Sequence, residues 1–365
     1  PLYSEQWHFG LIGDIETIWN EYDGTAVHVG VYDSAIEYDH PDFGTDLYDS
    51  SLHFVDSTGK VYDPSPTGPG TEAHGTSVAG LLLSRADNDL GGSGVAPGVT
   101  FTGVNFVGDI AANESEETII DALKWAQNFD IMSNSWGGGP FDTVLETAIA
   151  DAYAADIFFI AAAGNDGSDN DVVPHYPSNY ETPNVIAVMA TNHDDERVVE
   201  PGWWTSCIGA TTVDIAAPGL HIWSTTPNNT DSDYSGPSMA TPHVAGAMAM
   251  LRGRFPNISV DAGKNLLMTV GNDVLPALDG MSVTGARLNV LKLIADPDTI
   301  PPSAVTDLAV ADVASNWIDV QWTAPGDDDI VGTTSSYDVR WALAPILDEA
   351  RALAALGRLD EVEAL

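Results

Sequence analysis

The sequence has few basic residues and one cysteine. It contains 12 Lys and Arg against 54 Asp and Glu, a formal net charge of −42. A surface this acidic repels phosphate groups and anionic lipid, so we expect no nucleic-acid partner. Acidic side chains usually lie on solvated faces, and we prefer that interpretation to one in which they bind cations or basic substrates. Cys207 cannot form an intrachain disulfide, and its surroundings predict an inert, buried thiol.

Long hydrophobic runs are also missing. No apolar segment approaches the roughly 20 residues that cross a bilayer, so we expect no membrane insertion. The opening stretch PLYSEQWHFG has neither a basic nor an apolar region, and we therefore expect no signal peptide in it. The length of 365 residues predicts one large domain and a smaller second region.

Residues 1–295 alternate short apolar runs with helical patterns. The predicted strands are residues 26–33, 101–107, 130–136, 156–164 and 184–190. The predicted helices are residues 76–84, 116–128, 143–155 and 238–255. This alternation predicts an α/β fold with a doubly wound, mostly parallel sheet flanked by helices. Functional residues of such sheets lie beyond the carboxyl ends of the strands, where Asp33 and Asn165 fall.

The composition changes after residue 295. The stretch DPDTIPPSA predicts a linker over residues 296–303. Within residues 304–365, alternating polar and apolar residues first predict antiparallel strands. The motifs PPSAVTDLAV and VQWTAPGDDD there resemble the first half of a fibronectin type III domain. Apolar residues three apart near the end of the chain then indicate an amphipathic helical tail.

Four local motifs carry residues suited to acyl transfer. Asp33 ends VGVYD, His74 opens HGTSVAG, Asn165 lies in AAAGNDG and Ser238 lies in GPSMATPHVAG. A serine hydroxyl becomes nucleophilic when an imidazole takes its proton, and a carboxylate orients that imidazole. Each motif alone is more often a turn or a helix cap, and a serine before an apolar helix is by default an N-cap. All four in one chain are much more specific.

The chain resembles the subtilisin-like serine proteases, or subtilases, over residues 1–295, most clearly in HGTSVAG and SMATPHVAG. The order Asp, His, Ser along the chain is that of the subtilisins. The resemblance implies that Asp33 is the orienting acid, His74 the general base and Ser238 the nucleophile. It also implies that Asn165 and the backbone N–H of Ser238 form the oxyanion hole. The opening residues and DLGGSGVAP favour the kexin and convertase branch.

The resemblance further implies a substrate cleft. Its predicted lining residues are Ser135, Trp136, Gly137, Ala162, Ala163 and Gly164. Strand edges of such small residues leave backbone N–H and C=O groups that can pair with an extended peptide. The alternative is that both segments are merely exits from strands into loops.

A structural calcium ion is implied in the same way. Its predicted ligands are Asp42, Asn88 (or Asp87 in its place) and backbone oxygens of the loop that contains Arg85, Leu90 and Gly92. Hard oxygen ligands of this kind suit Ca²⁺. A second acidic group, Asp142, Asp169 and Asp171, is interpreted as solvated loop residues.

Two positions depart from the family pattern. Ala35 stands where the family usually has glycine, and its Cβ would be strained at a positive φ, which could displace Asp33. Pro237 stands where the family usually has threonine, whose hydroxyl supports the oxyanion. Proline supplies no such hydroxyl and no backbone donor. We expect its loss to cost about 1–2 kcal/mol of transition-state stabilisation.

The sequence therefore predicts a secreted, monomeric serine endopeptidase that hydrolyses protein or peptide substrates. A convertase-like enzyme that cleaves after basic residues is a second hypothesis. A third is an inactive subtilase scaffold that binds peptides or matrix, for which Pro237 is the argument.

Overall fold

The structure is a computed structural model that describes residues 2–13, 15–44, 47, 54–55, 61–62, 73–105, 121–123, 129–295, 309–313 and 318–321. The chain divides into two compact units, Pro1–Ala295 and Asp296–Leu365.

The first unit is built on an eight-stranded sheet with the order β13-β14-β10-β7-β6-β5-β1-β4. Its strands are β1 (His28–Asp33), β4 (Thr100–Asn105), β5 (Ile131–Asn134), β6 (Phe158–Ala162), β7 (Val185–Thr191), β10 (Ile215–Pro218), β13 (Asn272–Val274) and β14 (Ala286–Leu288). Neighbouring strands are parallel except β13 and β14. The five predicted strands are β1, β4, β5, β6 and β7, and the predicted fold class is confirmed.

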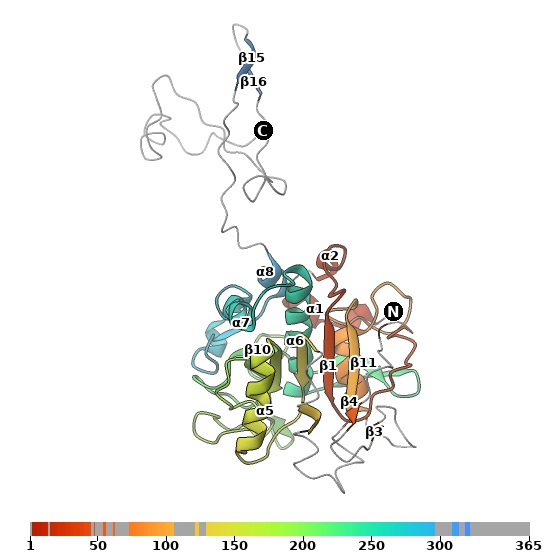
Figure 1. Cartoon of the computed structure of the whole chain (residues 1–365), viewed down its shortest axis with the longest axis vertical. Helices are drawn as coiled ribbons and strands as arrows, with labels where there is room; N and C mark the ends of the chain where they lie inside the picture. Colours follow the sequence, from red (N-terminus) through yellow and green to blue (C-terminus); the bar gives the residue numbers. More distant parts are fainter. Residues whose placement is uncertain are drawn as a thin grey trace. The chain divides into compact units, whose positions relative to one another are not determined.

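Helices flank this sheet (Figure 1). They are α1 (His8–Leu11), α2 (Ile15–Trp19), α3 (His74–Leu83), α5 (Thr143–Ala154), α6 (Pro237–Arg254), α7 (Val260–Thr269) and α8 (Val290–Ile294), with short 3₁₀ turns at Tyr3–Glu5 and Pro276–Leu278. Three two-stranded sheets complete the unit: β2 (Phe54–Val55) with β3 (Val61–Tyr62), β8 (Val199–Glu200) with β9 (Trp204–Thr205), and β11 (Ile222–Thr226) with β12 (Thr230–Tyr234). The helix predicted at 116–128 lies mostly outside the described residues.

Successive strand residues pack on opposite faces of the sheet, which gives the unit its layers. Ile160 belongs to the same buried cluster as Val244 and Met248 of α6. Its neighbour Phe159 belongs instead to the cluster that contains Ile149 of α5. α6 therefore covers one face of the sheet and α5 the other. This double burial explains why the strands are continuous apolar runs in the sequence.

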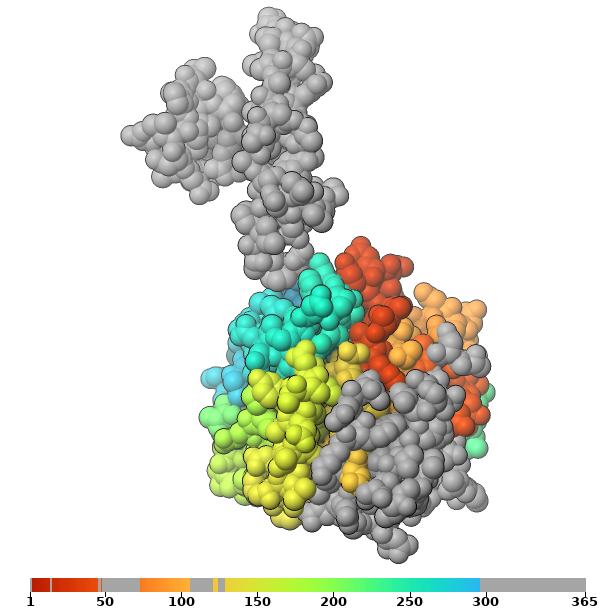
Figure 2. All heavy atoms as spheres, viewed as in Figure 1, coloured from red at the N-terminus to blue at the C-terminus, as the bar shows by residue number. Residues whose placement is uncertain are grey.

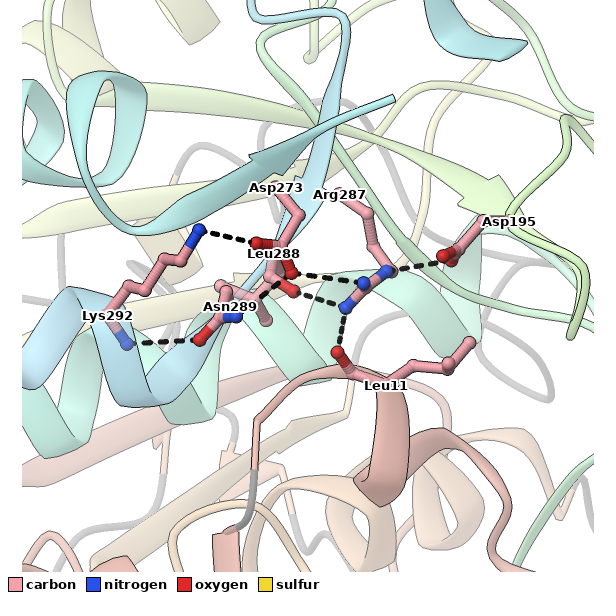
Figure 3. A network of polar contacts seen from close by, with 7 residues as sticks. All are labelled: Leu11, Asp195, Asp273, Arg287, Leu288, Asn289 and Lys292. Atoms are coloured by element: carbon pink, nitrogen blue, oxygen red, sulfur yellow. Dashed lines mark hydrogen bonds and ion pairs between the residues drawn. The ribbon is translucent and has the colours of Figure 1, made fainter. Parts of the chain in front are cut away.

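The two ends of the first unit meet, because α2 packs against α8. Figure 2 shows the N-terminal segment, in red, beside teal residues from the later part of this unit. A polar network nearby comprises Leu11, Asp195, Asp273, Arg287, Leu288, Asn289 and Lys292 (Figure 3).

Arg287 is the centre of this network and is 5% exposed. Its guanidinium donates to Asp195 Oδ1 at 2.7 Å, to Asp273 Oδ2 at 3.1 Å and to the carbonyl oxygen of Leu11. Lys292 Nζ donates to the other oxygen of Asp273 at 2.7 Å. Burial alone would raise the pKa of Asp273, but its hydrogen bonds and neighbouring cations outweigh burial and lower it. Charged side chains from four segments form this network, and the bond from Arg287 to the Leu11 carbonyl connects it to the N-terminal end of the unit.

In the second unit, β15 (Ala309–Val313) pairs with β16 (Ile318–Gln321) in an antiparallel hairpin, with a register shift between Val310 and Asp312. The fibronectin type III resemblance stays a prediction. The predicted helical tail lies outside the described residues. In the part of the chain that the structure describes, no helix is long and apolar enough to cross a membrane.

Candidate active site

Asp33 and His74 meet at the carboxyl edge of the sheet. Asp33 is the last residue of β1, and His74 is the first residue of α3. His74 Nδ1 lies 2.6 Å from Asp33 Oδ1, which also accepts a bond from the backbone N–H of Ser34 at 2.7 Å. The carboxylate is almost fully buried, whereas the imidazole is 36% exposed. A carboxylate so placed holds the proton on Nδ1 and leaves Nε2 as an acceptor.

Small residues allow α3 to approach the end of β1 so closely. A Cβ atom placed on Gly75 would lie 2.4 Å from the carbonyl oxygen of Ser34, so glycine is required there. The backbone N–H of Gly75 donates to Ser34 Oγ at 2.9 Å. Ala35 is not among the described residues with positive φ. The strain predicted at Ala35 is therefore wrong, because its backbone conformation accommodates a Cβ atom.

Ser238 is not the cap of its helix. α6 begins at Pro237, and its N-cap is Gly236, whose φ of 153° suits glycine. Ser238 is the second helical residue, so its hydroxyl caps nothing. Proline at the first helical position loses an N–H that has no partner inside the helix. The backbone donor missing at Pro237 is thus a smaller defect than the sequence suggested.

A second proline fixes the position of Ser238. Pro242 lies inside α6, four residues after Ser238, and has no N–H to donate to the Ser238 carbonyl. Ser135 Oγ donates to that carbonyl instead, at 2.8 Å. Ser238 Oγ in turn donates to the carbonyl oxygen of Ser135 at 3.3 Å. The start of α6 is therefore attached to the residue that follows β5.

Asn165 lies beside the start of the same helix. A Cβ atom placed on Gly236 would be 3.5 Å from Asn165 Oδ1 and 3.6 Å from Ser238 N. The Asn165 side chain and the Ser238 backbone N–H therefore border one small space. Asn165 is solvent-exposed. Its backbone carbonyl oxygen accepts a hydrogen bond from Thr205 N at 3.0 Å. An amide that is anchored through its backbone can direct its side chain at a ligand.

The predicted cleft residues separate into two groups. Ala163 is fully buried, its N–H donates to Val188, and its carbonyl oxygen accepts from Asn170. Gly164 O accepts from Cys207 N. Both backbone groups of Ala163 and the carbonyl of Gly164 are therefore already used, and the predicted free peptide-pairing edge is wrong for these three groups. Ser135, Trp136 and Gly137 follow β5, and Ala162 ends β6.

Sequence reasoning missed His175, which lies between Gly137 and Gly164. The loop that carries it, VVPHYPSNY, matches no motif that we used. Only the folded chain brings a residue so far along the sequence to both glycines.

The predicted calcium ligands form a compact group. Asn88 Nδ2 donates to Asp42 Oδ1 at 2.8 Å, and Arg85 N donates to the Asp42 carbonyl at 2.8 Å. A Cβ atom on Gly91 would lie 2.5 Å from Asp42 Oδ2 and 3.1 Å from Asp231 Oδ1. Neither of these carboxylate oxygens has a hydrogen-bond partner among the described residues. Sequence reasoning missed Asp231, which comes from β12.

The pKa values of Asp42 and Asp231 are raised, as expected of carboxyl groups that could bind a cation. Burial is the first cause that raises the pKa of Asp42 and of Asp231, and Asp231 adds to it at Asp42. A buried Asp42 carboxylate beside the half-buried Asp231 carboxylate is unfavourable unless positive charge compensates them, and the proximity of His40 opposes the pKa shift of both only in part. Leu90 N donates to Asn88 Oδ1, and Gly92 packs against Gln6. Within the described ranges, no three His, Cys, Asp or Glu side chains gather that could hold a metal ion.

The other acidic residues have local roles. Asp142 caps α5 through Val144 N and Leu145 N, and Asp171 accepts from Thr212 Oγ1 at 2.6 Å. Cys207 is fully buried, and burial raises the pKa of its thiol to about 11. A thiol with this pKa is not a nucleophile near neutral pH.

Comparisons with known proteins show the family of this chain. Residues 24–283 match the subtilase family of S8 peptidases. The chain is 36% identical to subtilisin NAT of Bacillus subtilis subsp. natto over 240 residues, 64% of this chain and 58% of that protein. It is 34% identical to subtilisin DY of Bacillus licheniformis over 256 residues, 69% of this chain and 86% of that protein. The chain thus spans little more than half the length of subtilisin NAT.

The fold has a counterpart among solved structures. A protease of Pseudoalteromonas arctica PAMC 21717 superposes with a TM-score of 0.68 at 22% sequence identity, over 81% of this chain and 98% of that one. At this identity the likeness concerns the fold.

Proposed function

Because this chain belongs to the subtilase family, we propose that it is a serine endopeptidase that hydrolyses peptide bonds through Asp33, His74 and Ser238. The observation that carries the proposal is the 2.6 Å contact between Asp33 and His74 at the sheet edge, on the side where β1 ends. Small residues around Gly236 leave room for a substrate backbone beside Ser238.

The first half of the reaction forms an acyl-enzyme. His74 Nε2 takes the proton of Ser238 Oγ, and the oxygen attacks the carbonyl carbon of the scissile bond. Asp33 stabilises the imidazolium that forms and keeps its orientation. The Asn165 amide and the Ser238 backbone N–H would donate to the oxygen that becomes negative. His74 then gives its proton to the leaving amine, and the C–N bond breaks.

Water completes the reaction. His74 takes a proton from water, the hydroxide attacks the acyl carbon, and the same two donors stabilise the second oxyanion. The proton returns to Ser238 Oγ as the ester bond breaks. The enzyme is thereby restored with no cofactor consumed.

A fluorophosphonate probe tests this function. We expect it to label the protein at Ser238, with labelling absent in Ser238→Ala and in His74→Ala. Loss of the serine should lower kcat/KM by about 10⁶-fold, the scale known for subtilisin, and the double variant should be no worse than either single variant. Ser259→Ala, at the exposed N-cap of α7, serves as a labelled control that keeps the nucleophile.

An inactive scaffold is the alternative, and Pro237 is the residue that favours it. It predicts a folded protein that binds peptides in the cleft but is not labelled by the probe. A wild-type protein that stays unlabelled while its thermal melt is cooperative would establish the scaffold and overturn the protease.

Calcium binding belongs to the same proposal. Asp42 Oδ2 and Asp231 Oδ1 would supply unpaired carboxylate oxygens, and backbone oxygens of the loop from Arg85 to Gly92, which contacts both at Gly91, would complete the site. Oxygen ligands of this number and charge suit Ca²⁺ better than softer metals. The ion would neutralise the two carboxylates and fix the loop after α3. Secretion and a monomeric state are likewise proposed from the family.

A further inference from the structure

His175 fills the gap between the segments that follow β5 and β6. A Cβ atom on Gly137 would lie 2.3 Å from His175 Cε1, and one on Gly164 would lie 2.8 Å from His175 Cδ2. A single imidazole ring therefore spans from one glycine to the other. Side chains are excluded at both glycines because the ring occupies that space.

The ring is held from behind. Ser178 Oγ donates to the carbonyl oxygen of His175 at 2.7 Å, so it accepts from His175 Nδ1 at 3.2 Å. The backbone N–H of His175 donates to Asn179 Oδ1 at 3.0 Å. His175 Nε2 lies near both glycines and makes no hydrogen bond with the described residues. The unpaired edge of the ring thus faces the gap.

The ring is neutral near neutral pH. Burial lowers the pKa of His175, and Asp166 opposes this only partly. Asp166 Oδ1 is itself engaged by Cys207 Sγ at 2.9 Å and by Ser168 N at 3.0 Å, and these bonds lower the pKa of Asp166 to about 2. Cys207, with its raised pKa, stays a neutral thiol. The imidazole that faces the gap is therefore uncharged, and the Asp166 carboxylate near it is ionised.

In the proposed reaction, the scissile residue would lie beside this gap. Its carbonyl carbon would meet Ser238 Oγ, and that hydroxyl contacts the Ser135 carbonyl, two residues before Gly137. Its oxygen would meet the Asn165 amide, one residue after Gly164. The side chain of the same residue would then lie next to the two glycine segments that His175 joins.

We propose that His175 determines the substrate preference of this cleft, so that the enzyme cleaves after small residues such as glycine, alanine and serine. The inference rests on the proposed protease function. A phenyl or a long aliphatic side chain needs the volume that the imidazole already occupies. A small side chain ends before it reaches the ring.

Peptide substrates that differ only at the cleaved residue test this. With glycine, alanine, leucine, phenylalanine or lysine at that position, we expect wild-type kcat/KM for alanine to exceed that for phenylalanine at least about 10-fold. His175→Ala should raise kcat/KM for phenylalanine about 10- to 100-fold and change that for alanine about 3-fold or less. His175→Asn, which is smaller but still polar, should gain activity toward leucine more than toward phenylalanine. His193→Ala, an exposed histidine elsewhere in this unit, is the matched control and should keep the wild-type preference.

Fluorophosphonate labelling of each variant separates the two possible failures. Suppose the wild type is labelled, and the ratio of kcat/KM for alanine to that for phenylalanine is the same in His175→Ala as in the wild type. That result overturns the inference and leaves the protease function intact. An unlabelled wild type overturns the function itself. Should His175→Ala fail to fold, as judged by a lost cooperative melt, the His175→Asn comparison decides, and an unchanged ratio there also overturns the inference.

Discussion

The cleft and the Arg287 network both contain buried polar groups, but they differ in how completely these groups are paired. Arg287 bonds two carboxylates and two backbone oxygens, and Lys292 bonds an oxygen of Asp273 (Figure 3). In the cleft, Asp33 Oδ2 has no partner among the described residues, and Ser238 Oγ makes one long contact of 3.3 Å. Groups that are fully paired can only hold the structure together, whereas groups with spare capacity can bind a ligand.

This difference has an energetic basis. An unpaired buried polar group costs about 1–3 kcal/mol, and a ligand that pairs with it recovers part of this free energy. A paired group at the end of the unit carries no such cost. Substitutions in the network should therefore affect stability, and substitutions in the cleft should affect rate.

The largest expected effect on stability comes from Arg287→Leu. This change leaves Asp195 and Asp273 without their guanidinium partner and frees the Leu11 carbonyl. Breaking one side of a buried ion pair costs about 3–5 kcal/mol. Urea unfolding in a Ser238→Ala background, which prevents self-digestion, measures the loss. kcat/KM of the otherwise wild-type variant should change by less than about 2-fold at a temperature where it is folded.

Lys292→Met is the matched control for this prediction. Lys292 bonds the same Asp273, but its side chain is 53% exposed. Exposed pairs contribute about 0–1 kcal/mol. Equal losses in the two variants would show that the burial of Arg287 has no special role.

The next-largest expected effect on stability comes from a pair of buried histidines outside both regions. His8 Nδ1 contacts His243 Nε2, and His243 Nδ1 contacts the carbonyl oxygen of Met239. Burial lowers the pKa of His243 to about 4 and also lowers that of His8, to which the proximity of His243 adds. His8 Nε2 has no partner among the described residues, yet it faces the core, where no ligand arrives.

Acid should therefore destabilise the protein in a defined pH window. An unfolded histidine takes up a proton near pH 6.5, whereas folded His243 does so only near pH 4. Between these values the unfolded state binds more protons, so the stability that is fully present above pH 6.5 decreases as the pH falls to 4. Two and a half pKa units correspond to about 3 kcal/mol for His243. Urea unfolding from pH 7.5 to 4 measures the loss.

Replacing both histidines with apolar residues, as in His8→Phe with His243→Leu, provides the control. The double variant lacks the groups that take up protons, so its stability should depend less on pH in this window. Carboxylates contribute equally to both proteins. The same pH dependence in the double variant would assign the effect to other groups.

The sequence predicted the parallel sheet because its central strands are buried on both faces. Residues such as Phe159 and Ile160 are apolar in succession, and that is visible without a structure. Strands β10 to β14 were not predicted, because they are three to five residues long and all except β10 mix polar with apolar positions. Periodicity needs more residues than these to be recognised.

The site was predictable only where chemistry is carried by a local motif. Asp33 and His74 were found from the few residues on either side of each. His175 and Asp231 have no such motif, and their significance comes from partners in other segments. The effect of Pro242 was missed for another reason. The carbonyl that it leaves free, that of Ser238, accepts a hydrogen bond from Ser135, which follows β5 and is distant in the sequence.

Calcium removal gives the next-largest expected effect, because Asp42 Oδ2 and Asp231 Oδ1 gain a partner only if an ion binds. At a free calcium concentration about 100 times Kd, bound calcium stabilises the protein by about 2.7 kcal/mol. EDTA should remove this in the Ser238→Ala background at constant ionic strength. Asp231→Asn should abolish most of the stabilisation by calcium. In EDTA this variant should be more stable than the parent protein, since one of two neighbouring carboxylate charges is gone.

Asp233→Asn, on the same strand, is the control for calcium removal. Its carboxylate bonds exposed His221. We expect its calcium response to equal that of the parent protein. An unfolding midpoint that EDTA leaves unchanged would refute the calcium site.

The smallest effect is expected from Pro237→Thr, which adds one donor to the cleft. A hydroxyl beside the oxyanion should increase kcat about 5- to 30-fold, the equivalent of about 1–2 kcal/mol, with little change in KM. Proline suits the first position of α6, so the variant should lose about 0.4–1 kcal/mol of stability. Pro237→Ala removes the ring without adding the hydroxyl, and it should lose the same stability with no gain in kcat. If kcat of Pro237→Ala increases as much as that of Pro237→Thr, the ring of Pro237 rather than a missing hydroxyl limits the rate. An added hydrogen-bond donor in the cleft would then not be the cause of the faster reaction.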